Sequence, residues 1–336
     1  MTAQALVAPE KGILAADESD GTIKKRFDSI NIESSEQHRR DYRELLFQTC
    51  GIGAYISGVI LFDETIRQNS TDGASLVKVL LDQEIIPGIK VDKGGQPLPT
   101  SPKELVTNGL DSLTDRLEEY VSLGARFTKW RGLITIGEGL PTRHCIDTNA
   151  HALARFAALS QKAGLVPIVE PEILMDGNHD IDRCFEVTET TLREVFYQLA
   201  EHGVILEGCL LKTNMVLPGS SSSSQSVPEE IASKTLACLK RVVPAAIPGI
   251  VFLSGGQSDN EATANLDAIN RKGNDLGAPW QLSFSYGRGL QQAALRAWAG
   301  KKDNVQQAKE AFYHRAKLTS AARQGIYTHD MEIPTV

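Results

Sequence analysis

Three lysines and two glutamates in this chain have the types and the spacing that amine chemistry requires. Lys90, Lys129 and Lys212 are each embedded in apolar sequence, where an unpaired ammonium would be costly without a carboxylate or another anion beside it. Glu170 and Glu172 are two residues apart, a spacing that points both carboxylates to one side of an extended chain. A lysine that shares a partly dry pocket with other cations loses its proton more readily and can attack a carbonyl carbon. The set predicts a lysine nucleophile with carboxylates as its acid and base groups.

Lys212 is the strongest candidate for the nucleophile because it ends the most apolar of these segments. The two glutamates belong to the preceding apolar segment, and two acids that share a site should have pKa values that separate into an acid role and a base role. The alternative is a structural ion-pair network in which Glu170 and Glu172 only neutralise Lys129 and Arg131.

Two glycine-containing segments have the composition of a phosphate-binding loop. Glycine lets backbone N–H groups approach an oxyanion closely, and a guanidinium adds charge-assisted hydrogen bonds. A simple turn is the alternative interpretation of motifs this short, so the prediction depends on where the fold places them. The six candidate phosphate contacts are Ser254, Gly255, Gly256, Ser285, Gly287 and Arg288.

Other common chemistries lack their motifs in this sequence. The seven histidines form no HxH or HExxH arrangement, so we expect no metal site. Neither a Gly-x-Gly-x-x-Gly motif after an apolar segment nor a Walker loop is present, so we expect no dinucleotide or nucleotide cofactor. The five cysteines form no CxxC pair, and their odd number is unlike a disulfide framework, which predicts free thiols in a reducing compartment.

The elements that would position these residues are eight short apolar segments with turn-forming residues at their ends. They cover residues 12–16, 57–62, 87–91, 125–130, 165–169, 208–212, 249–253 and 280–284. Their continuous rather than alternating apolarity is typical of parallel strands that are buried on both faces. Amphipathic helical patterns lie between them, such as the run 148–163 that Gly164 closes and the helix that opens at 227–230.

Eight alternating strand and helix units predict an α/β fold, a single-domain (β/α)8 barrel over residues 1–336. An open doubly wound sheet would produce much the same local pattern and is the alternative. In a barrel, the polar residues at the strand ends converge on the carboxyl-terminal rim, where the active sites of this fold are built. Residues 219–226 are serine-rich and predict a flexible loop, and residues 329–336 predict a mobile tail.

Composition limits the partners that the protein could have. Of the 336 residues, 41% are hydrophobic and 23% are charged, and the net charge is −7. No overall positive field would attract nucleic acid or an anionic membrane, so an anionic ligand must meet local cations. Residues 1–10 have no targeting character, and no apolar stretch reaches membrane-spanning length, so we expect a cytoplasmic protein.

Five long segments, in order along the chain, resemble the class I fructose-bisphosphate aldolases. They are Gly12–Ser19, Gly88–Gly94, Lys129–Arg131, Ile168–Leu174 and Leu253–Ser258, and the resemblance runs from Lys11 to Tyr327. So many long motifs in one order make the resemblance highly specific. It implies a (β/α)8 barrel, a homotetramer, and a cytoplasmic lyase of glycolysis and gluconeogenesis that acts on a sugar phosphate without a metal or an organic cofactor.

The resemblance also implies roles for individual residues. Lys212 would form the Schiff base, Glu170 would act as general acid and base, and Asp17 would take the C4 hydroxyl proton as the C3–C4 bond breaks. Lys129 with Glu172 would orient the site and balance its charge, and Arg131 would assist. The phosphate next to C1 would lie on Ser254, Gly255 and Arg288, with Gly256, Ser285 and Gly287 close by. The distal phosphate at C6 would meet Ser19, Thr22, Lys25, Arg26 and Lys90.

The chain departs from the family pattern in three places. Thr213 follows the lysine where proline is usual, and Thr22 stands where serine is usual. Family members commonly end in a tyrosine that protonates the enamine, whereas this sequence ends at Val336, and Tyr327 is not an obvious substitute. The proton donor is therefore unidentified. The alternatives for function are an aldolase that prefers fructose 1-phosphate or sedoheptulose 1,7-bisphosphate, and a non-catalytic scaffold on the same barrel.

Overall fold

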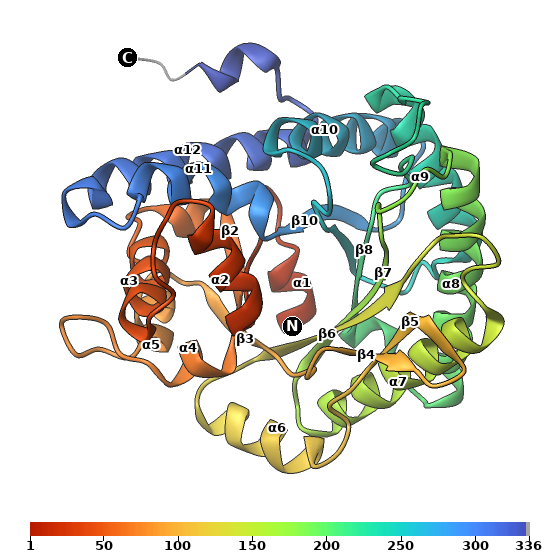
Figure 1. The fold of residues 1–336 in the computed structure, drawn as a ribbon, viewed down its shortest axis with the longest axis horizontal. Helices are drawn as coiled ribbons and strands as arrows, with labels where there is room; N and C mark the ends of the chain where they lie inside the picture. The colour runs from red at the N-terminus through yellow and green to blue at the C-terminus, as the bar shows by residue number, and fades with distance from the viewer. Residues whose placement is uncertain (334–336) are drawn as a thin grey trace.

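The structure, a computed structural model, describes residues 1–333. Eight parallel strands form a closed barrel in the order β1-β10-β9-β8-β7-β6-β3-β2 (Figure 1). The strands are β1 Gly12–Ala16, β2 Ile56–Leu61, β3 Ile86–Lys90, β6 Phe127–Ile134, β7 Val166–Ile173, β8 Leu210–Thr213, β9 Gly249–Phe252 and β10 Gln281–Tyr286. The predicted (β/α)8 barrel is confirmed. The alternative of an open sheet is wrong, because β1 pairs with both β2 and β10.

Each of the eight predicted apolar segments forms one barrel strand, and every residue of β1, β2, β8 and β9 is buried. Two strands run farther than the apolar pattern predicts. Strand β6 continues to Ile134, and β7 continues to Ile173. Parallel pairing continues through their charged positions, with Arg131 opposite Glu170. The charged residues of β6 and β7 therefore lie within the strands and not in loops after them.

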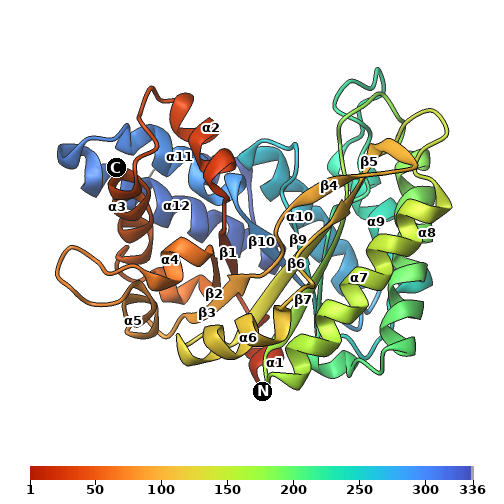
Figure 2. The ribbon, with the colours of Figure 1, turned by 60° about the horizontal axis from the view of Figure 1, so that its bottom comes forward.

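Helices surround the barrel on its outside (Figures 1 and 2). The principal ones are α2 Asp20–Asp28, α3 Glu36–Phe47, α4 Asp63–Arg67, α5 Leu76–Leu81, α6 Leu113–Ser122, α7 Arg143–Lys162, α8 Ile181–Glu201, α9 Pro228–Val242, α10 Asp259–Asp275, α11 Arg288–Trp298 and α12 Val305–Gln324. The predicted signals are present at α7, which Gly164 follows with a φ of +78°, and at α9, which opens on Pro228. Helix α7 begins earlier than predicted because the Thr142 side chain caps it by accepting from Cys145 N.

The interior of the barrel is apolar at one end and charged at the other. Side chains along a strand alternate between its two faces, so residues that are two apart face the same side. Asp17, Lys129, Glu170 and Lys212 each stand two residues after a member of the apolar layer, so they face the same interior one layer higher. The apolar layer consists of Ala3, Leu6, Val7, Ile13, Ala15, Ile60, Phe127, Ile168, Leu210 and Val251.

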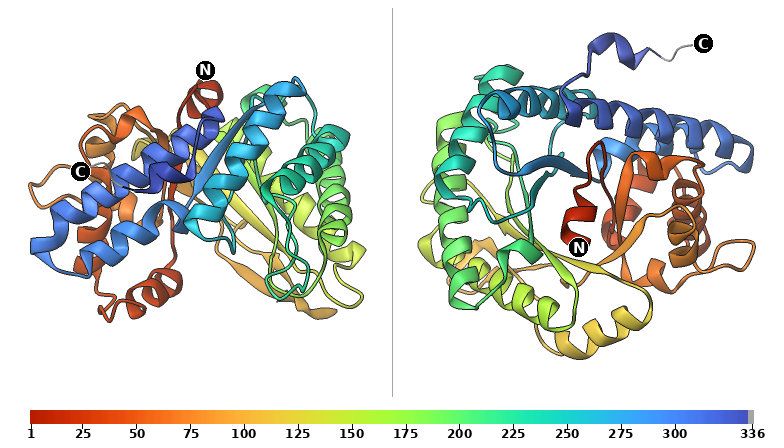
Figure 3. Two further views of the ribbon diagram at one scale, coloured as in Figure 1. Left: turned by 90° about the horizontal axis from the view of Figure 1, so that it is seen from above. Right: turned by 180° about the vertical axis from the view of Figure 1, so that it is seen from behind.

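The short N-terminal helix α1, Thr2–Leu6, closes the apolar end of the barrel, and the sequence pattern did not predict it. Seen from behind, the N-terminal segment lies inside the ring of strands (Figure 3). Leu6 and Val7 pack against the inner apolar layer, and Ser57 Oγ donates to the Leu6 carbonyl oxygen at 2.6 Å. This end of the barrel is therefore filled, and the charged end is left for ligands.

A hairpin of β4 Gly95–Leu98 and β5 Ser101–Thr107 lies at the opposite end of the barrel from α1 (Figure 2). It is an insertion between β3 and α6 that the sequence analysis did not predict. Thr107 Oγ1 donates to the Arg131 carbonyl oxygen at 2.6 Å, and Glu104 accepts from Thr142 N at 2.7 Å. The hairpin is thus attached to β6 and to the start of α7.

The serine-rich loop and the C-terminal tail were both predicted to be mobile, and this stays a prediction. The loop begins with backbone hydrogen bonds from Gly219, Ser220 and Ser221 to the segment that links β7 to α8. In the tail, His329–Glu332 forms a turn of 3-10 helix, and residues 334–336 lie outside the described residues. Within residues 1–333, no helix is long and apolar enough to cross a membrane.

Candidate active site

Four charged side chains form a continuous line of ion pairs at the carboxyl-terminal end of the barrel. Lys129 Nζ lies 2.6 Å from Asp17 Oδ2 and 3.0 Å from Glu170 Oε2. The other oxygen of Glu170, Oε1, lies 3.1 Å from Lys212 Nζ. Lys129 and Glu170 are 3% exposed and Lys212 is 4% exposed, so these charges face one another in a nearly dry interior. The structure thus brings together four of the five predicted catalytic residues.

The electrostatics of this line hold Asp17, Glu170 and Lys129 in their charged states. Burial alone would raise the pKa of Asp17, but Lys129, Lys212 and Lys90 outweigh it, and the pKa of Asp17 is lowered. The pKa of Glu170 is lowered in the same way, since burial is outweighed by Lys129, Lys212 and Arg131. Burial would lower the pKa of Lys129, but Asp17 and Glu170 outweigh it, and that pKa is raised. Lys129 is therefore a fixed cation between two carboxylates.

Glu170 contacts both lysines of the line. Its Oε1 atom lies 3.1 Å from Lys212 Nζ, and its Oε2 atom lies 3.0 Å from Lys129 Nζ. The carboxylate therefore lies between the two lysine side chains and is within reach of protons on either one.

Glu172, the fifth predicted catalytic residue, has different neighbours from Glu170. Its Oε2 atom accepts from Arg131 Nε, and this carboxylate outweighs the effect of burial and raises the pKa of Arg131. A methyl group at Gly255 would lie 3.0 Å from Glu172 Oε1. Glu172 therefore links β7 to the segment after β9. The ion-pair network that the sequence left as an alternative exists, but Glu170 also reaches Lys212.

The predicted proximal phosphate contacts come together where β9 and β10 end side by side. Ser254 Oγ accepts from Gly289 N at 3.4 Å, and Arg288 Nη2 donates to the Gln257 carbonyl oxygen at 3.2 Å. Ser285 is 1% exposed, and its Oγ atom has no hydrogen-bond partner among the described residues. A buried hydroxyl without a partner indicates a missing acceptor or donor, as a bound phosphate would provide.

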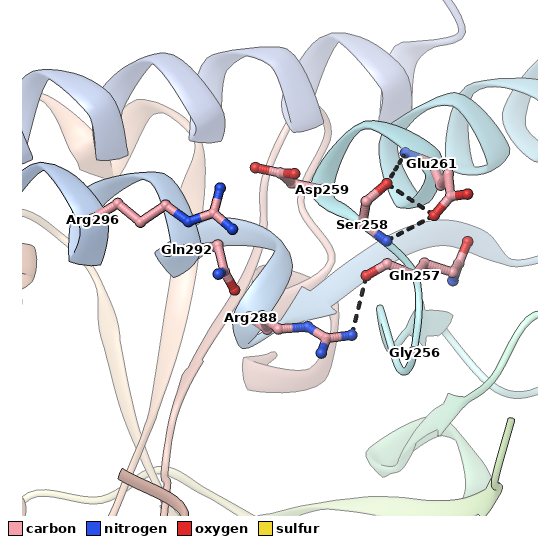
Figure 4. A pocket seen from close by; sticks show the side chains of 8 residues that line it. All are labelled: Gly256, Gln257, Ser258, Asp259, Glu261, Arg288, Gln292 and Arg296. Atoms are coloured by element: carbon pink, nitrogen blue, oxygen red, sulfur yellow. Dashed lines mark hydrogen bonds between the residues drawn. The ribbon is translucent and has the colours of Figure 1, made fainter. Parts of the chain in front are cut away.

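A cavity of about 450 Å³ adjoins this segment, between the start of α10 and one face of α11 (Figure 4). Of the six predicted proximal phosphate contacts, Gly256 and Arg288 line this cavity. The cavity is lined by Gly256, Gln257, Ser258, Asp259, Glu261, Arg288, Gln292 and Arg296.

The predicted distal phosphate contacts are less uniform. Ser19 Oγ lies 3.2 Å from Thr22 Oγ1 at the start of α2, and Lys25 is exposed on the same helix. Lys90 Nζ instead lies 2.7 Å from Asp92 Oδ1, and Arg26 Nη1 forms an ion pair with Glu18. Within residues 1–333, no hydrogen bond or ion pair joins Lys90 to α2, so the structure groups only part of this set.

Sequence reasoning missed several buried polar residues around the site. Glu18, Arg43 and Gln291 form a hydrogen-bonded cluster near Asp17. Asp92, which follows the third strand and was expected at the rim with Lys90, pairs with Lys90 and accepts from Arg131 N at 3.3 Å. Glu18 follows Asp17 directly, which was an available signal. Arg43 and Gln291 lie in helical sequence where a polar side chain normally faces solvent, so only tertiary structure identifies them.

No group of three or more His, Cys, Asp and Glu side chains in residues 1–333 is arranged to hold a metal ion. The five cysteines are free, and four of them are buried. Burial raises the pKa of Cys209 to about 12, so this thiol stays protonated and unreactive at neutral pH.

Comparisons with known proteins agree with this geometry. A family model described as fructose-bisphosphate aldolase class-I matches residues 1–335. A protein of Xanthomonas campestris pv. campestris named probable fructose-bisphosphate aldolase class 1 is 57% identical over 327 residues, which cover 96% of each chain. Fructose-bisphosphate aldolase 4, cytosolic, of Arabidopsis thaliana is 54% identical over 97% of this chain and 82% of the plant protein. The solved structure of fructose-bisphosphate aldolase from Plasmodium falciparum, in a ternary complex with TRAP and a small-molecule inhibitor, is 50% identical with a TM-score of 0.95, covering 97% of this chain and 94% of that chain.

Proposed function

The chain belongs to the class I fructose-bisphosphate aldolase family, and from that membership we propose that Lys212 forms the Schiff base of its reaction. The protein is a carbon–carbon lyase that cleaves fructose 1,6-bisphosphate reversibly to dihydroxyacetone phosphate and glyceraldehyde 3-phosphate, a step of glycolysis and gluconeogenesis. The relatives above are all named for fructose bisphosphate. The alternatives of another preferred ketose phosphate or a non-catalytic scaffold therefore gain no support.

One observation carries the assignment of the nucleophile, namely the different surroundings of two buried lysines. Lys129 Nζ is within 3.0 Å of two carboxylates, whereas within residues 1–333 the one ion-pair partner of Lys212 Nζ is Glu170, at 3.1 Å. Two carboxylates engage Lys129, while Lys212 has a single carboxylate beside it that can accept and return protons. We therefore assign Lys212 as the amine that attacks the C2 carbonyl carbon.

In the proposed reaction, Glu170 accepts a proton from the Lys212 side chain 3.1 Å away, and the free amine adds to C2. One proton then moves from the nitrogen to the former carbonyl oxygen, and Glu170 returns its proton to that oxygen, which leaves as water. The resulting iminium ion is an electron sink. When the C3–C4 bond breaks, its electron pair enters the iminium system to form an enamine, and Asp17 accepts the C4 hydroxyl proton. The lowered pKa of Asp17 keeps it ionised as a base, and Lys129 at 2.6 Å stabilises its charge before the proton arrives.

Phosphate binding would align the reacting bond from a distance, which is how remote binding energy reaches the chemical step. We assign the phosphate next to C1 to Ser254, Gly255, Gly256, Ser285, Gly287 and Arg288, supported by the unpartnered Ser285 hydroxyl. We assign the distal phosphate at C6 to Ser19, Thr22, Lys25, Arg26 and Lys90, with Arg131 and Glu172 beside the reacting carbons.

The proposal is tested by cleavage assays on three ketose phosphates with and without EDTA. We expect the highest kcat/KM with fructose 1,6-bisphosphate and lower kcat/KM values with fructose 1-phosphate and sedoheptulose 1,7-bisphosphate. Activity should be complete in EDTA. Lys212→Met should fold normally and lose turnover, while Lys234→Met on the outer helix α9 should be unchanged. Normal turnover by Lys212→Met would contradict the assignment, and loss of activity in EDTA that zinc restores would point to a metal-dependent route.

We further propose that the chain is a single domain that assembles as a homotetramer in the cytoplasm and has no nucleic-acid partner. Two observations support this, namely that plant relatives are named cytosolic and that the net charge is −7. Light scattering should give the mass of four 36.6 kDa chains. A monomer at working concentrations would contradict the assembly.

A further inference from the structure

Three arginines are buried in the part of the chain that the structure describes, and one of them has no acid beside it. Arg43 Nη1 lies 3.3 Å from Glu64 Oε2. Arg315 Nη2 lies 2.8 Å from Glu332 Oε1. Arg323, near the end of α12, is 6% exposed and makes no ion pair within residues 1–333. A buried charge is costly unless an opposite charge accompanies it, so Arg323 lacks a partner that the other two arginines have.

Neutral acceptors hold the guanidinium of Arg323 in place without balancing its charge. Its Nη1 atom donates to the carbonyl oxygens of Ala8 and Lys11. Its Nη2 atom donates to the Val7 carbonyl oxygen at 2.7 Å and to Gln281 Oε1 at 3.1 Å. Burial lowers the pKa of Arg323 to about 10. The Nε–H group makes no hydrogen bond within residues 1–333, so one donor of this cation is available to a ligand.

Arg323 lines a cavity of about 340 Å³ at the opposite end of the strands from the active site. The wall of the cavity comes from the link between α1 and β1, the second half of α10, the start of β10 and the end of α12. The amino-terminal ends of the parallel strands meet here, whereas Lys212 and the other reacting groups lie near the carboxyl-terminal ends. The cavity is therefore separate from the site of the proposed reaction.

Two amide side chains in the wall add further N–H donors. Asn270 is 6% exposed and uses one amide N–H to donate to the Leu266 carbonyl oxygen at 3.0 Å, which leaves its second N–H. Gln281 accepts from Arg323 through Oε1, and its NH2 group donates no hydrogen bond within residues 1–333. The cavity thus combines one unbalanced cation with several N–H donors, which is the recognition chemistry of an oxyanion.

The remaining wall sets the shape and the charge of a ligand. Trp280 donates its Nε1–H to the Pro244 carbonyl oxygen at 2.9 Å, so its ring and Leu282 offer apolar surface to the cavity. Glu10 also lines the cavity, so a second negative charge on a ligand would meet a like charge. The wall therefore favours a single negative charge on a small apolar body over a dianion.

We infer that this cavity is a second ligand site, which binds a small monocarboxylate with its carboxylate on Arg323 and Gln281 and its apolar body against Trp280. The carboxylate supplies the opposite charge that Arg323 lacks and accepts a charge-assisted hydrogen bond from its Nε–H. Because the cavity lies at the other end of the strands, failure of this inference would leave the assignment of Lys212 intact.

Titration calorimetry of the full-length protein with benzoate, at pH 7 and constant ionic strength, tests the site. We expect one benzoate per chain with a Kd of about 1 mM or lower, and at least about tenfold weaker binding by Arg323→Gln. Arg288→Ala, which removes a cation at the active site, is the matched control and should keep the wild-type affinity. Unchanged binding by Arg323→Gln, or loss of binding in Arg288→Ala instead, would overturn the inference.

Asn274→Trp gives the same test without altering the buried cation, in case Arg323→Gln does not fold. Asn274 is exposed and lines the cavity, so a larger side chain there should fill the space and weaken benzoate binding about tenfold. A cooperative thermal unfolding transition shows that a variant is folded. Wild-type benzoate affinity in folded Asn274→Trp would place the ligand elsewhere and refute the site.

Phthalate tests the charge that the site accepts, because it adds a second carboxylate to the benzoate ring. The wild type should bind phthalate about tenfold more weakly than benzoate, and Glu10→Gln should bring the two affinities within about twofold. Equal affinities for the two probes in the wild type would contradict the preference for a single charge.

Discussion

Lys129 and Lys212 carry the same amine, but the barrel surrounds them with different charges. Lys129 lies between Asp17 and Glu170, which raise its pKa, while Lys212 has one carboxylate neighbour. In the proposed mechanism, Lys129 stays a cation and Lys212 acts as the nucleophile. Because both side chains are almost fully buried, their surroundings and not their exposure determine these roles.

The ion pairs of Lys129 predict how stability depends on pH. Folding lowers the pKa of Asp17 and Glu170, so their contribution to stability is complete above about pH 4 and is lost as the pH falls through their folded values. Folding raises the pKa of Lys129, so its contribution is complete below about pH 10 and is lost as the pH rises through its folded value.

Lys129→Met should therefore destabilise the protein and change how its stability depends on pH in acid. Removing one partner of a buried ion pair costs about 3–5 kcal/mol. Without the cation, the folded pKa values of Asp17 and Glu170 rise toward their unfolded values, so the variant should lose less stability than the wild type as the pH falls below about 4. Urea-unfolding midpoints measured from about pH 7 down into this acid range record both effects. Lys234→Met is the control on the surface. The same acid dependence in Lys129→Met and the wild type would show that these ion pairs do not stabilise the fold.

At the scale of elements, strand β10 offers two buried serines that should behave in opposite ways. Ser283 Oγ donates to the Lys11 carbonyl oxygen at 2.9 Å, while Ser285 Oγ has no partner within residues 1–333. Ser285→Ala should leave thermal stability unchanged or improved and raise KM, because that hydroxyl is satisfied only by the ligand. Ser283→Ala should lower thermal stability and leave KM unchanged. If the two variants exchanged these effects, the phosphate assignment would be wrong.

The C-terminal segment gives a second prediction at this scale. Tyr327 Oη donates to Glu332 Oε1 at 2.7 Å, and Arg315 Nη2 lies 2.8 Å from the same oxygen. The tyrosine is therefore engaged in the C-terminal segment, and its contact with Glu332 adds to burial in raising its pKa. We expect Tyr327→Phe to keep kcat within about twofold, because a group that does not touch the reacting atoms removes no transition-state contact.

The proton step itself can be measured for this variant. Exchange of the substrate-derived proton of dihydroxyacetone phosphate with deuterated solvent follows enamine protonation separately from cleavage. Tyr327→Phe should exchange at the wild-type rate. A large loss of exchange with normal bond cleavage would mean that Tyr327 leaves Glu332 and delivers the proton.

The sequence predicts the barrel strands well because burial on both faces leaves continuous apolar runs. It fails where charged residues continue a strand, as at Arg131 and Glu172, since a charge normally marks a strand end. The hairpin at 95–107 was not predicted because its own residues show little alternation of apolar and polar types, and its contacts with β6 and α7 hold it in place. Helix α1 was missed because five residues are too few to show a helical period.

The candidate site was predictable for residues at strand ends and not for residues on helices. Lys212 and Glu170 each stand two residues after an apolar residue that faces the barrel interior, so strand alternation alone directs them inward. Arg26 could be named from its motif, but its contact with Gly287 joins segments that are far apart in sequence. Contacts of that kind depend on how α2 packs on the barrel, which local pattern does not specify.

At the scale of the whole molecule, the barrel separates a filled apolar end from an open charged end. Helix α1 and the inner apolar layer close one end, and the lysines, carboxylates and phosphate segments lie at the other (Figures 2 and 3). The net charge of −7 does not oppose an anionic substrate there, because Lys90, Lys129 and Lys212 lie at this end of the strands.

The central claim, that the reaction proceeds through a Schiff base on Lys212, is tested most directly by trapping the intermediate. The full-length protein is incubated with dihydroxyacetone phosphate, reduced with borohydride, digested, and mapped by mass spectrometry. We predict one covalent adduct, located on Lys212, which is absent when borohydride is added without the ketose phosphate. An adduct on Lys129 or on another lysine, or cleavage activity without any adduct, would contradict the account.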